Sequence, residues 1–259
     1  MATPAESITG TYIYCVMPTP GTEAVDPATL GKSVGASEPV RVLRSNGLAA
    51  IVSDAVRDQY DPSRANIGAH EHVVQGAFER GDVLPVRFGT VAQNDDTVQR
   101  FLRDNHSSLQ KSLEGLHDRG EMVLKATWDQ NAILKELLAG NETIRAMRDE
   151  IASRPEAETY DQRIELGRMV SEAIEEERKR LADLVVERLR PKAADTEVHQ
   201  LLSETMVVNA GFLVERNSME AFDKEVGALG EELRGKLNFK YVGPLPPYSF
   251  VRINVPKEG

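Results

Sequence analysis

Two histidines in the segment His70-Glu71-His72 come closest to the residue types of a metal or catalytic site. A helical zinc site of the metalloprotease kind needs histidines four residues apart, whereas positions i and i+2 of a helix point about 200° apart. His70 falls on the apolar stripe with Ile67 and Val74, and His72 falls opposite. We therefore predict a buried, hydrogen-bonded His70 that binds no metal. A ligand or catalytic role for His70 is the alternative.

Other candidate motifs favour structural roles. The Gly-Lys-Ser at residues 31–33 could end a phosphate-binding loop, but the first glycine of that motif is replaced by Asp26. Asp95 and Asp96 precede a helical pattern, where carboxylates stabilise a helix N-terminus. No Gly-x-Gly-x-x-Gly or Cys-x-x-Cys motif occurs. The sequence thus predicts no catalytic residue, no cofactor and no bound metal.

The N-terminal part of the chain predicts the order strand, hairpin, helix, strand. An Asn-Gly between two apolar runs is a strong hairpin signal, and an Asp-Pro pair is a typical helix start. Pro85 favours an edge position or a bulge in the last strand. The predicted elements are a strand from Thr11 to Met17, a hairpin around Asn46-Gly47, a helix from Asp61-Pro62 to Gly81, and a strand over 82–89.

The C-terminal part repeats this order and contains the longest element. A possible capping box at Thr159 and Gln162 begins a helix that Pro191 ends, with a length of roughly 45 Å at 1.5 Å per residue. The other predicted elements are a strand over 121–128, short helices capped by Asp129 and Asn141, a strand over 205–215 interrupted near 209–211, a helix capped by Ser218, and extended segments over 237–242 and 248–255.

These patterns predict an α+β fold with two ferredoxin-like domains, each with helices against an antiparallel sheet. We expect an N-terminal α+β domain over residues 1–120 and a C-terminal one, with the long helix and the tail, over residues 121–259. The boundary should fall near 118–121, where limited proteolysis would cut first unless it cut in the loop over 18–39.

Composition narrows the function classes. The 259 residues are 41% hydrophobic and 28% charged, which is typical of a globular protein with a core. A formal net charge of −10 disfavours nucleic acid and anionic lipid as partners. The single cysteine, Cys15, excludes an internal disulfide, and no run approaches the roughly 18 apolar residues of a membrane span. The N-terminus lacks the features of a signal peptide, so we expect a cytoplasmic setting.

Two unusual segments each have two interpretations, one structural and one functional. The charge run Glu175 to Arg180 is typical of a solvated helix face with opposite-charge pairs such as Glu175 with Lys179, and could also be a partner-binding face. The proline-rich segment Gly243 to Phe250 could be a rigid edge or a binding ridge. Trp128 and Tyr160 are expected to pack inside the protein.

Several stretches together resemble the gas vesicle GvpF/GvpL family. They are TYIYCVM near the start, HEHVVQGAFERGDVLPVRFGT at 70–90, the long charged helix, NAGFLVERNSMEAFDKEV at 209–226 and KYVGPLPPYSFV at 240–251. The resemblance implies a non-enzymatic role as a minor vesicle component or accessory protein, in the gas vesicle or in the cytoplasm where it is built. It implies as partners the small hydrophobic, GvpA-like shell protein and other accessory proteins, and it carries over no catalytic residues.

A binding surface for the shell protein is expected in the N-terminal domain, because edge strands are natural sites for adding a partner segment. The strands over 11–17 and 83–89 are expected to expose such an edge. The partner-binding candidates are Tyr12, Tyr14, Val83, Pro85 and Arg87. The alternative is a small-ligand sensor or enzyme on a ferredoxin-like fold, with a pocket joining His70 to carboxylates or to Arg87. A scaffold that contacts only other accessory proteins is a further alternative.

Overall fold

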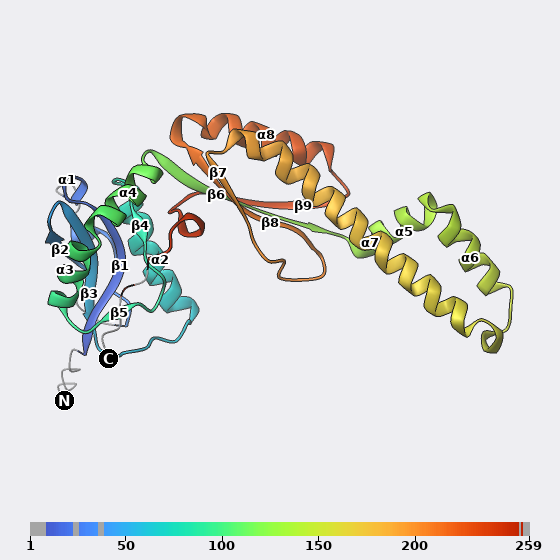
Figure 1. The fold of residues 1–259 in the computed structure, drawn as a ribbon, viewed down its shortest axis with the longest axis horizontal. Helices are drawn as coiled ribbons and strands as arrows, with labels where there is room; N and C mark the ends of the chain where they lie inside the picture. The colour runs from blue at the N-terminus through green and yellow to red at the C-terminus, as the bar shows by residue number, and fades with distance from the viewer. Residues whose placement is uncertain (1–8, 23–25, 36–38, 254, 256–259) are drawn as a thin grey trace. The chain divides into compact units, whose positions relative to one another are not determined.

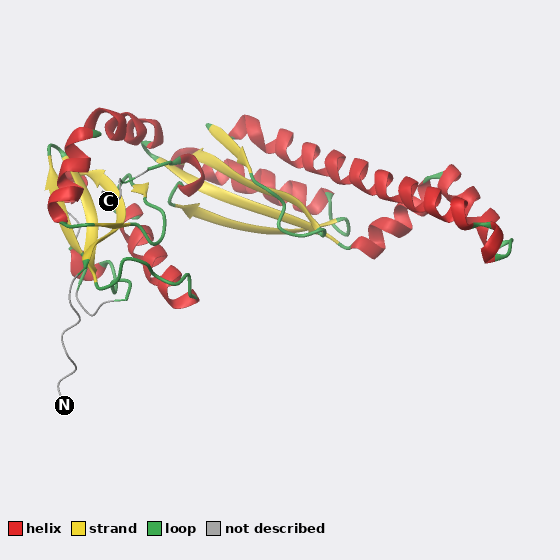
Figure 2. Cartoon of the chain, turned by 60° about the horizontal axis from the view of Figure 1, so that its bottom comes forward, coloured by secondary structure: helices red, strands yellow, loops and turns green. Residues whose placement is uncertain are grey.

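The computed structural model describes residues 9–22, 26–35, 39–253 and 255 (Figure 1). The chain divides into two compact units. The first unit comprises Met1–Glu121 together with Gly243–Gly259, and the second comprises Met122–Val242. Each unit pairs one sheet with helices (Figure 2), which confirms the α+β prediction.

The sheet of the first unit has the strand order β2-β3-β1-β4, with β5 also pairing with β1. Across the sheet, the four strands of the main path lie in the spatial order 2-3-1-4, where each number is the strand's position in the sequence. This is the strand order of a split βαβ unit. The elements are β1 Gly10–Pro18, α1 Thr19–Thr22, β2 Arg41–Ser45, β3 Leu48–Ala55, α2 Arg64–Phe78, β4 Leu84–Pro85, β5 Val91–Ala92, α3 Asp95–Asp104 and α4 His106–Leu116.

Local sequence explains the hairpin and the central strand of this sheet. Asn46 and Gly47 both have positive φ angles, 50° and 81°, so the predicted Asn-Gly turn joins β2 to β3. The aromatic and β-branched run of β1 pairs antiparallel with β3 on one side and with β4 and β5 on the other. β1 is thus the central strand, and its side chains form the core together with α2.

Two predicted boundaries in the first unit are wrong. α2 begins after Ser63, whose hydroxyl accepts from the Asn66 N–H at 3.2 Å, and not at Asp61-Pro62. The predicted strand over 82–89 shrinks to β4, followed by the turn that Thr90 closes on Arg87 O and by β5. Pro85 has no N–H to donate, which limits the ladder at this edge.

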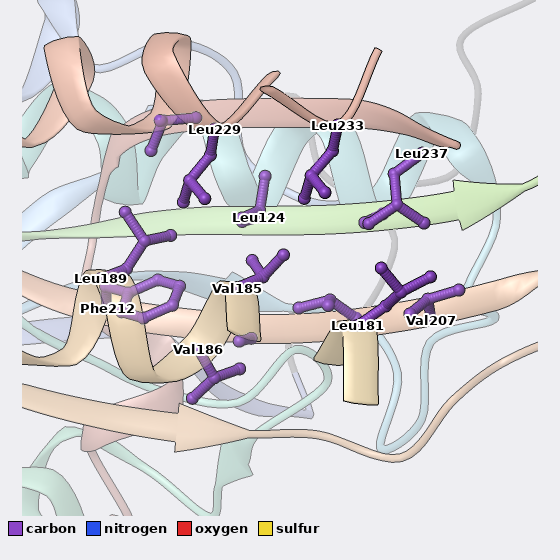
Figure 3. Packing of buried hydrophobic residues seen from close by; sticks show 14 of the residues in the cluster. Leu124, Leu181, Val185, Val186, Leu189, Val207, Phe212, Leu229, Leu233 and Leu237 are labelled. Atoms are coloured by element: carbon purple, nitrogen blue, oxygen red, sulfur yellow. The ribbon is translucent and has the colours of Figure 1, made fainter. Parts of the chain in front are cut away.

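The second unit has the same strand arrangement, β7-β8-β6-β9, with the long helix between its first and second strands. Its elements are β6 Arg119–Trp128, α5 Gln130–Gly140, α6 Glu142–Ala152, α7 Tyr160–Leu189, β7 Asp195–Val198, β8 Met206–Glu215, α8 Met219–Glu232 and β9 Leu237–Leu245. α7 and α8 pack on this sheet through leucine and valine side chains that meet those of β6 and β8 (Figure 3).

The predicted helix caps of the second unit form at α5 and α6 but not at α7. Asp129 accepts from the N–H groups of Asn131 and Ala132, and Asn141 accepts from that of Ile144, as predicted. The predicted capping box of α7 is wrong, because the Thr159 hydroxyl donates back toward carbonyls of the preceding turn and makes no cap bond. β8 runs without the predicted interruption. The short, polar β7 was not predicted at all.

The charge run on α7 forms half-buried ion pairs three residues apart. Arg178 pairs with Glu175 and Arg180 with Glu177, each at 2.6 Å, where the sequence suggested Glu175 with Lys179. Arg178 also lies over the Trp128 ring, 5.1 Å from its centroid, and Trp128 is buried as expected. Tyr160 is instead 70% exposed at the start of α7, so its predicted packing is wrong.

The division into units differs from the predicted domains in the C-terminal tail. The prediction placed all of 121–259 in the second domain, whereas Gly243–Gly259 groups with the first unit. The predicted boundary near 118–121 coincides with β6, whose Gly120 and Glu121 are buried. First cleavage is therefore expected within residues 18–39 and not in 118–121.

Independent packing of the two units is a testable expectation. Ile51 and Ile133 belong to separate core clusters, and an Ile→Val change in a core costs about 0.5–1.5 kcal/mol. Amide hydrogen exchange should therefore accelerate within the first unit for Ile51→Val and within the second for Ile133→Val. Equal acceleration throughout the chain by either variant would contradict two separately packed domains.

Candidate functional site

His70 sits at the centre of a buried hydrogen-bond network in the first unit. Its side chain is 2% exposed. Nε2 lies 3.1 Å from the carbonyl oxygen of Val86, which can only accept, so Nε2 carries the proton. Nδ1 then accepts from the Tyr12 hydroxyl at 3.1 Å, and this hydroxyl accepts from the Gly89 N–H at 2.9 Å. The network ties α2 to β1 and to the segment after β4.

Aromatic rings surround this histidine. Tyr14 stacks on His70 with ring centroids 5.5 Å apart, and Tyr12 and Phe88 approach it edge-on at 5.8 Å. The Tyr14 hydroxyl accepts from the Val34 N–H at 2.8 Å and lies 3.1 Å from Ser53 Oγ. Burial raises the pKa of both tyrosines, which keeps them protonated. The predicted burial of His70 is confirmed, and its partners are Tyr12 and Val86, not carboxylates or Arg87.

The His70 network predicts an acid-sensitive stability. Burial lowers the pKa of His70 from 6.5 to about 4, with the hydrogen bond to Val86 opposing part of this shift. The unfolded chain therefore takes up this proton before the folded chain does. The contribution of neutral His70 to the free energy of unfolding is complete above about pH 6.5 and is lost as the pH falls toward 4. This loss is on the order of 3 kcal/mol in total.

Urea denaturation at closely spaced pH values between 7 and 4 would measure this loss. His70→Gln, which lacks a titrating group, should flatten the curve in this window. An unchanged slope in that variant would assign the acid sensitivity to other groups.

The structure separates the five predicted partner-binding residues. Tyr12 and Tyr14 are 0% exposed, Val83 is 1% exposed and Pro85 is buried, whereas Arg87 is exposed. The expectation of a free edge at β1 is wrong, because β1 is paired on both sides. Strand order is set by pairing between distant segments, which the local pattern of residues 11–17 does not reveal. The edge of the sheet on this side is formed by β4 and β5.

A groove lies where β4 meets the C-terminal segment. It has a volume of about 370 Å³, within the roughly 300–1,000 Å³ of typical ligand pockets. Pro85 and Arg87 form one wall, and the other is formed by Tyr248, Val251, Arg252 and Ile253. We call this the C-terminal groove. Of the five candidates, it brings together Pro85 and Arg87 and leaves Tyr12, Tyr14 and Val83 in the core.

A buried carboxylate fixes the C-terminal wall of this groove. Glu121 is 3% exposed, and its two oxygens accept from the backbone N–H of Ser249, at 2.9 Å, and from the Ser249 hydroxyl. Residues 248–250 form a 3-10 turn, so the predicted extended segment over 248–255 is wrong at its start. Neither Glu121 nor Ser249 was predicted as a site residue, although an acid among the apolar residues of EMVLKATW signals a buried partner.

Among the residues that the structure describes, no group of three or more His, Cys, Asp or Glu side chains could hold a metal ion. No helix in the described part of the chain is long and apolar enough to cross a membrane.

Comparisons with known proteins agree on one family. The family described as gas vesicle synthesis protein GvpL/GvpF matches residues 10–252. Gas vesicle protein F of Streptomyces sp. (strain CB03234) is 34% identical over 87% of this chain and 93% of its own length. Gas vesicle protein L1 of Halobacterium salinarum is 23% identical over 93% of this chain and 90% of its own length.

Solved structures show the same fold. The crystal structure of the gas vesicle protein GvpF from Anabaena sp. PCC7120 matches with a TM-score of 0.81 and 24% identity, covering 95% of this chain and 99% of that one. The GvpF structure from Microcystis aeruginosa matches with a TM-score of 0.76 and 21% identity, covering 95% and 100%.

Proposed function

Because the chain belongs to the gas vesicle GvpL/GvpF family, we propose that it is an accessory protein of gas vesicle assembly that binds the small hydrophobic shell protein. The observation that carries the proposal is the family match over residues 10–252, which spans both units. The chain is similar to both F and L gas vesicle proteins, so a gas vesicle role is what these relatives share.

The C-terminal groove is the surface that we assign to the shell protein. A small apolar subunit that assembles into a shell needs an apolar surface to hold it before assembly, on a protein that itself stays dispersed. The groove offers the apolar side chains of Val251 and Ile253 and the partly exposed Tyr248 ring. The formal net charge of −10 makes copies of the chain repel one another, which keeps the protein dispersed.

A non-catalytic role is part of this proposal. Both ring nitrogens of His70, the residue of the sequence best suited to acid–base chemistry, are engaged in holding the core. Its lowered pKa keeps it neutral at pH 7, and burial separates it from the solvent. The relatives are named as gas vesicle proteins and not as enzymes. We therefore favour binding over a sensor or enzyme function.

The proposal is tested by pull-down of the tagged intact chain against each gas vesicle protein produced in the same cells. Recovery of the shell protein in the absence of the other components is expected. Recovery of other accessory proteins without the shell protein would favour a scaffold role and would overturn the assignment. We expect the chain to be found with gas vesicles or in the cytoplasm during their assembly, as fractionation of vesicle-forming cells would show.

A further inference from the structure

The C-terminal groove combines apolar walls with two guanidinium groups. Pro85, Val251 and Ile253 supply the apolar contacts, and Arg87 and Arg252 supply the charges. Both arginines are exposed. Within the described part of the chain, the Arg87 side chain has no hydrogen bond and no ion pair. The neighbouring carboxylate of Glu121 is already occupied by Ser249. This leaves Arg87 available to a ligand.

We infer that the C-terminal groove binds an extended apolar segment carrying one carboxylate side chain, and that Arg87 holds this carboxylate. The inference rests on the proposed function and deepens it by naming the chemistry of the bound segment. Arginine matches a carboxylate because its planar donors form paired, charge-assisted hydrogen bonds. The apolar residues on either side of the carboxylate pack against Val251 and Ile253.

The charges around the groove define where the carboxylate lies. Arg87 and Arg252 make the groove attractive to a carboxylate, in a chain whose overall charge of −10 repels acidic ligands elsewhere. This contrast between the two arginines and an acidic protein favours the groove over other places on the surface.

The backbone at β4 favours side-chain recognition over strand addition. β4 has two residues, and Pro85 lacks the N–H that a long added ladder would need. A segment in the groove is therefore held mainly by its side chains. Removing the acidic group should then have a large effect on affinity, because few backbone bonds compensate for it.

Fluorescence anisotropy with two labelled, end-blocked peptides tests the inference on the intact chain. The first has the sequence serine–valine–isoleucine–glutamate–valine–serine, and the second replaces glutamate by glutamine. A hydrogen bond to a charged group contributes about 1.5–3 kcal/mol, so the glutamate peptide should bind at least about tenfold more tightly. Arg87→Gln should remove this preference, and Arg87→Lys should retain part of it.

Matched controls separate the groove from general charge effects. Arg103→Gln removes an exposed arginine of α3 in the same unit that does not line the groove, and it should leave the preference intact. Equal affinity of both peptides for the intact chain, or loss of preference with Arg103→Gln alone, would overturn the inference. Binding only after deletion of residues 256–259 would also overturn it, because the chain's own end would then be the occupant.

The outcome for the groove is independent of the outcome for the proposed function. If the shell protein co-purifies but the peptides are not distinguished, the proposed function stands and the carboxylate recognition is wrong. If the glutamate peptide is preferred but the shell protein does not co-purify, the groove is a carboxylate-reading site for another partner. The shell protein would then be the wrong assignment.

Discussion

Replacement of His70 by alanine is expected to lower the free energy of unfolding of the first unit by about 3–5 kcal/mol. The change leaves a cavity in the core and removes the partners of two buried groups, the Tyr12 hydroxyl and the Val86 carbonyl. Each buried polar group left unpaired costs about 1–3 kcal/mol, and the lost ring contacts with Tyr14 add to this. Urea denaturation at pH 7, followed by near-ultraviolet circular dichroism, would measure the loss.

His72 provides the control on the same helix. It is exposed, so His72→Ala should change stability by less than about 0.5 kcal/mol. His70→Gln should lose less than alanine, because its amide can still donate to Val86. If His70→Ala were as stable as the wild type, the buried network would not support the first unit as described.

Replacement of Glu121 by alanine is expected to release the C-terminal wall of the groove. The Ser249 N–H and hydroxyl both donate to this carboxylate, and bonds to charged groups contribute about 1.5–3 kcal/mol each. A loss of about 3 kcal/mol raises the detached population roughly a hundredfold. Limited proteolysis should then cut within residues 246–253, which the intact protein protects, and recovery of the shell protein should fall with it.

Two further variants keep this result interpretable. Ser249→Ala removes only the hydroxyl and should give a smaller increase in cleavage, without touching β6. Glu114→Ala removes an exposed glutamate of α4 and should leave cleavage unchanged. Unchanged cleavage in Glu121→Ala would mean that other contacts fix the C-terminal segment. Full recovery of the shell protein despite cleavage would mean that the shell protein does not bind in the C-terminal groove.

Local signals in the sequence predicted the parts of the fold that depend on neighbouring residues. The Asn46-Gly47 turn and the caps at Asp129 and Asn141 form as expected because each is decided within four residues. The α7 cap failed because the Thr159 hydroxyl is taken by the preceding turn. β7 escaped prediction because its polar residues gain strand structure only by pairing with β8.

The candidate site was predicted in part for the same reason. Pro85 signalled an edge and does lie in β4, and Arg87 is exposed beside it. Tyr12 and Tyr14 were assigned to that edge although β1 is central, since the order of strands depends on contacts far apart in sequence. The bond between Glu121 and Ser249 joins residues 128 positions apart, which no local pattern indicates.

The central claim is that this chain binds the gas vesicle shell protein. Its most direct test is co-expression of the shell protein with the tagged intact chain in cells that contain no other gas vesicle protein. The amount of shell protein that stays in the supernatant and elutes with the tag is then measured. We expect soluble shell protein that co-elutes with the intact chain, in an amount that Glu121→Ala reduces and Glu114→Ala does not. Shell protein that remains in the pellet, with none bound to the intact chain, would contradict it.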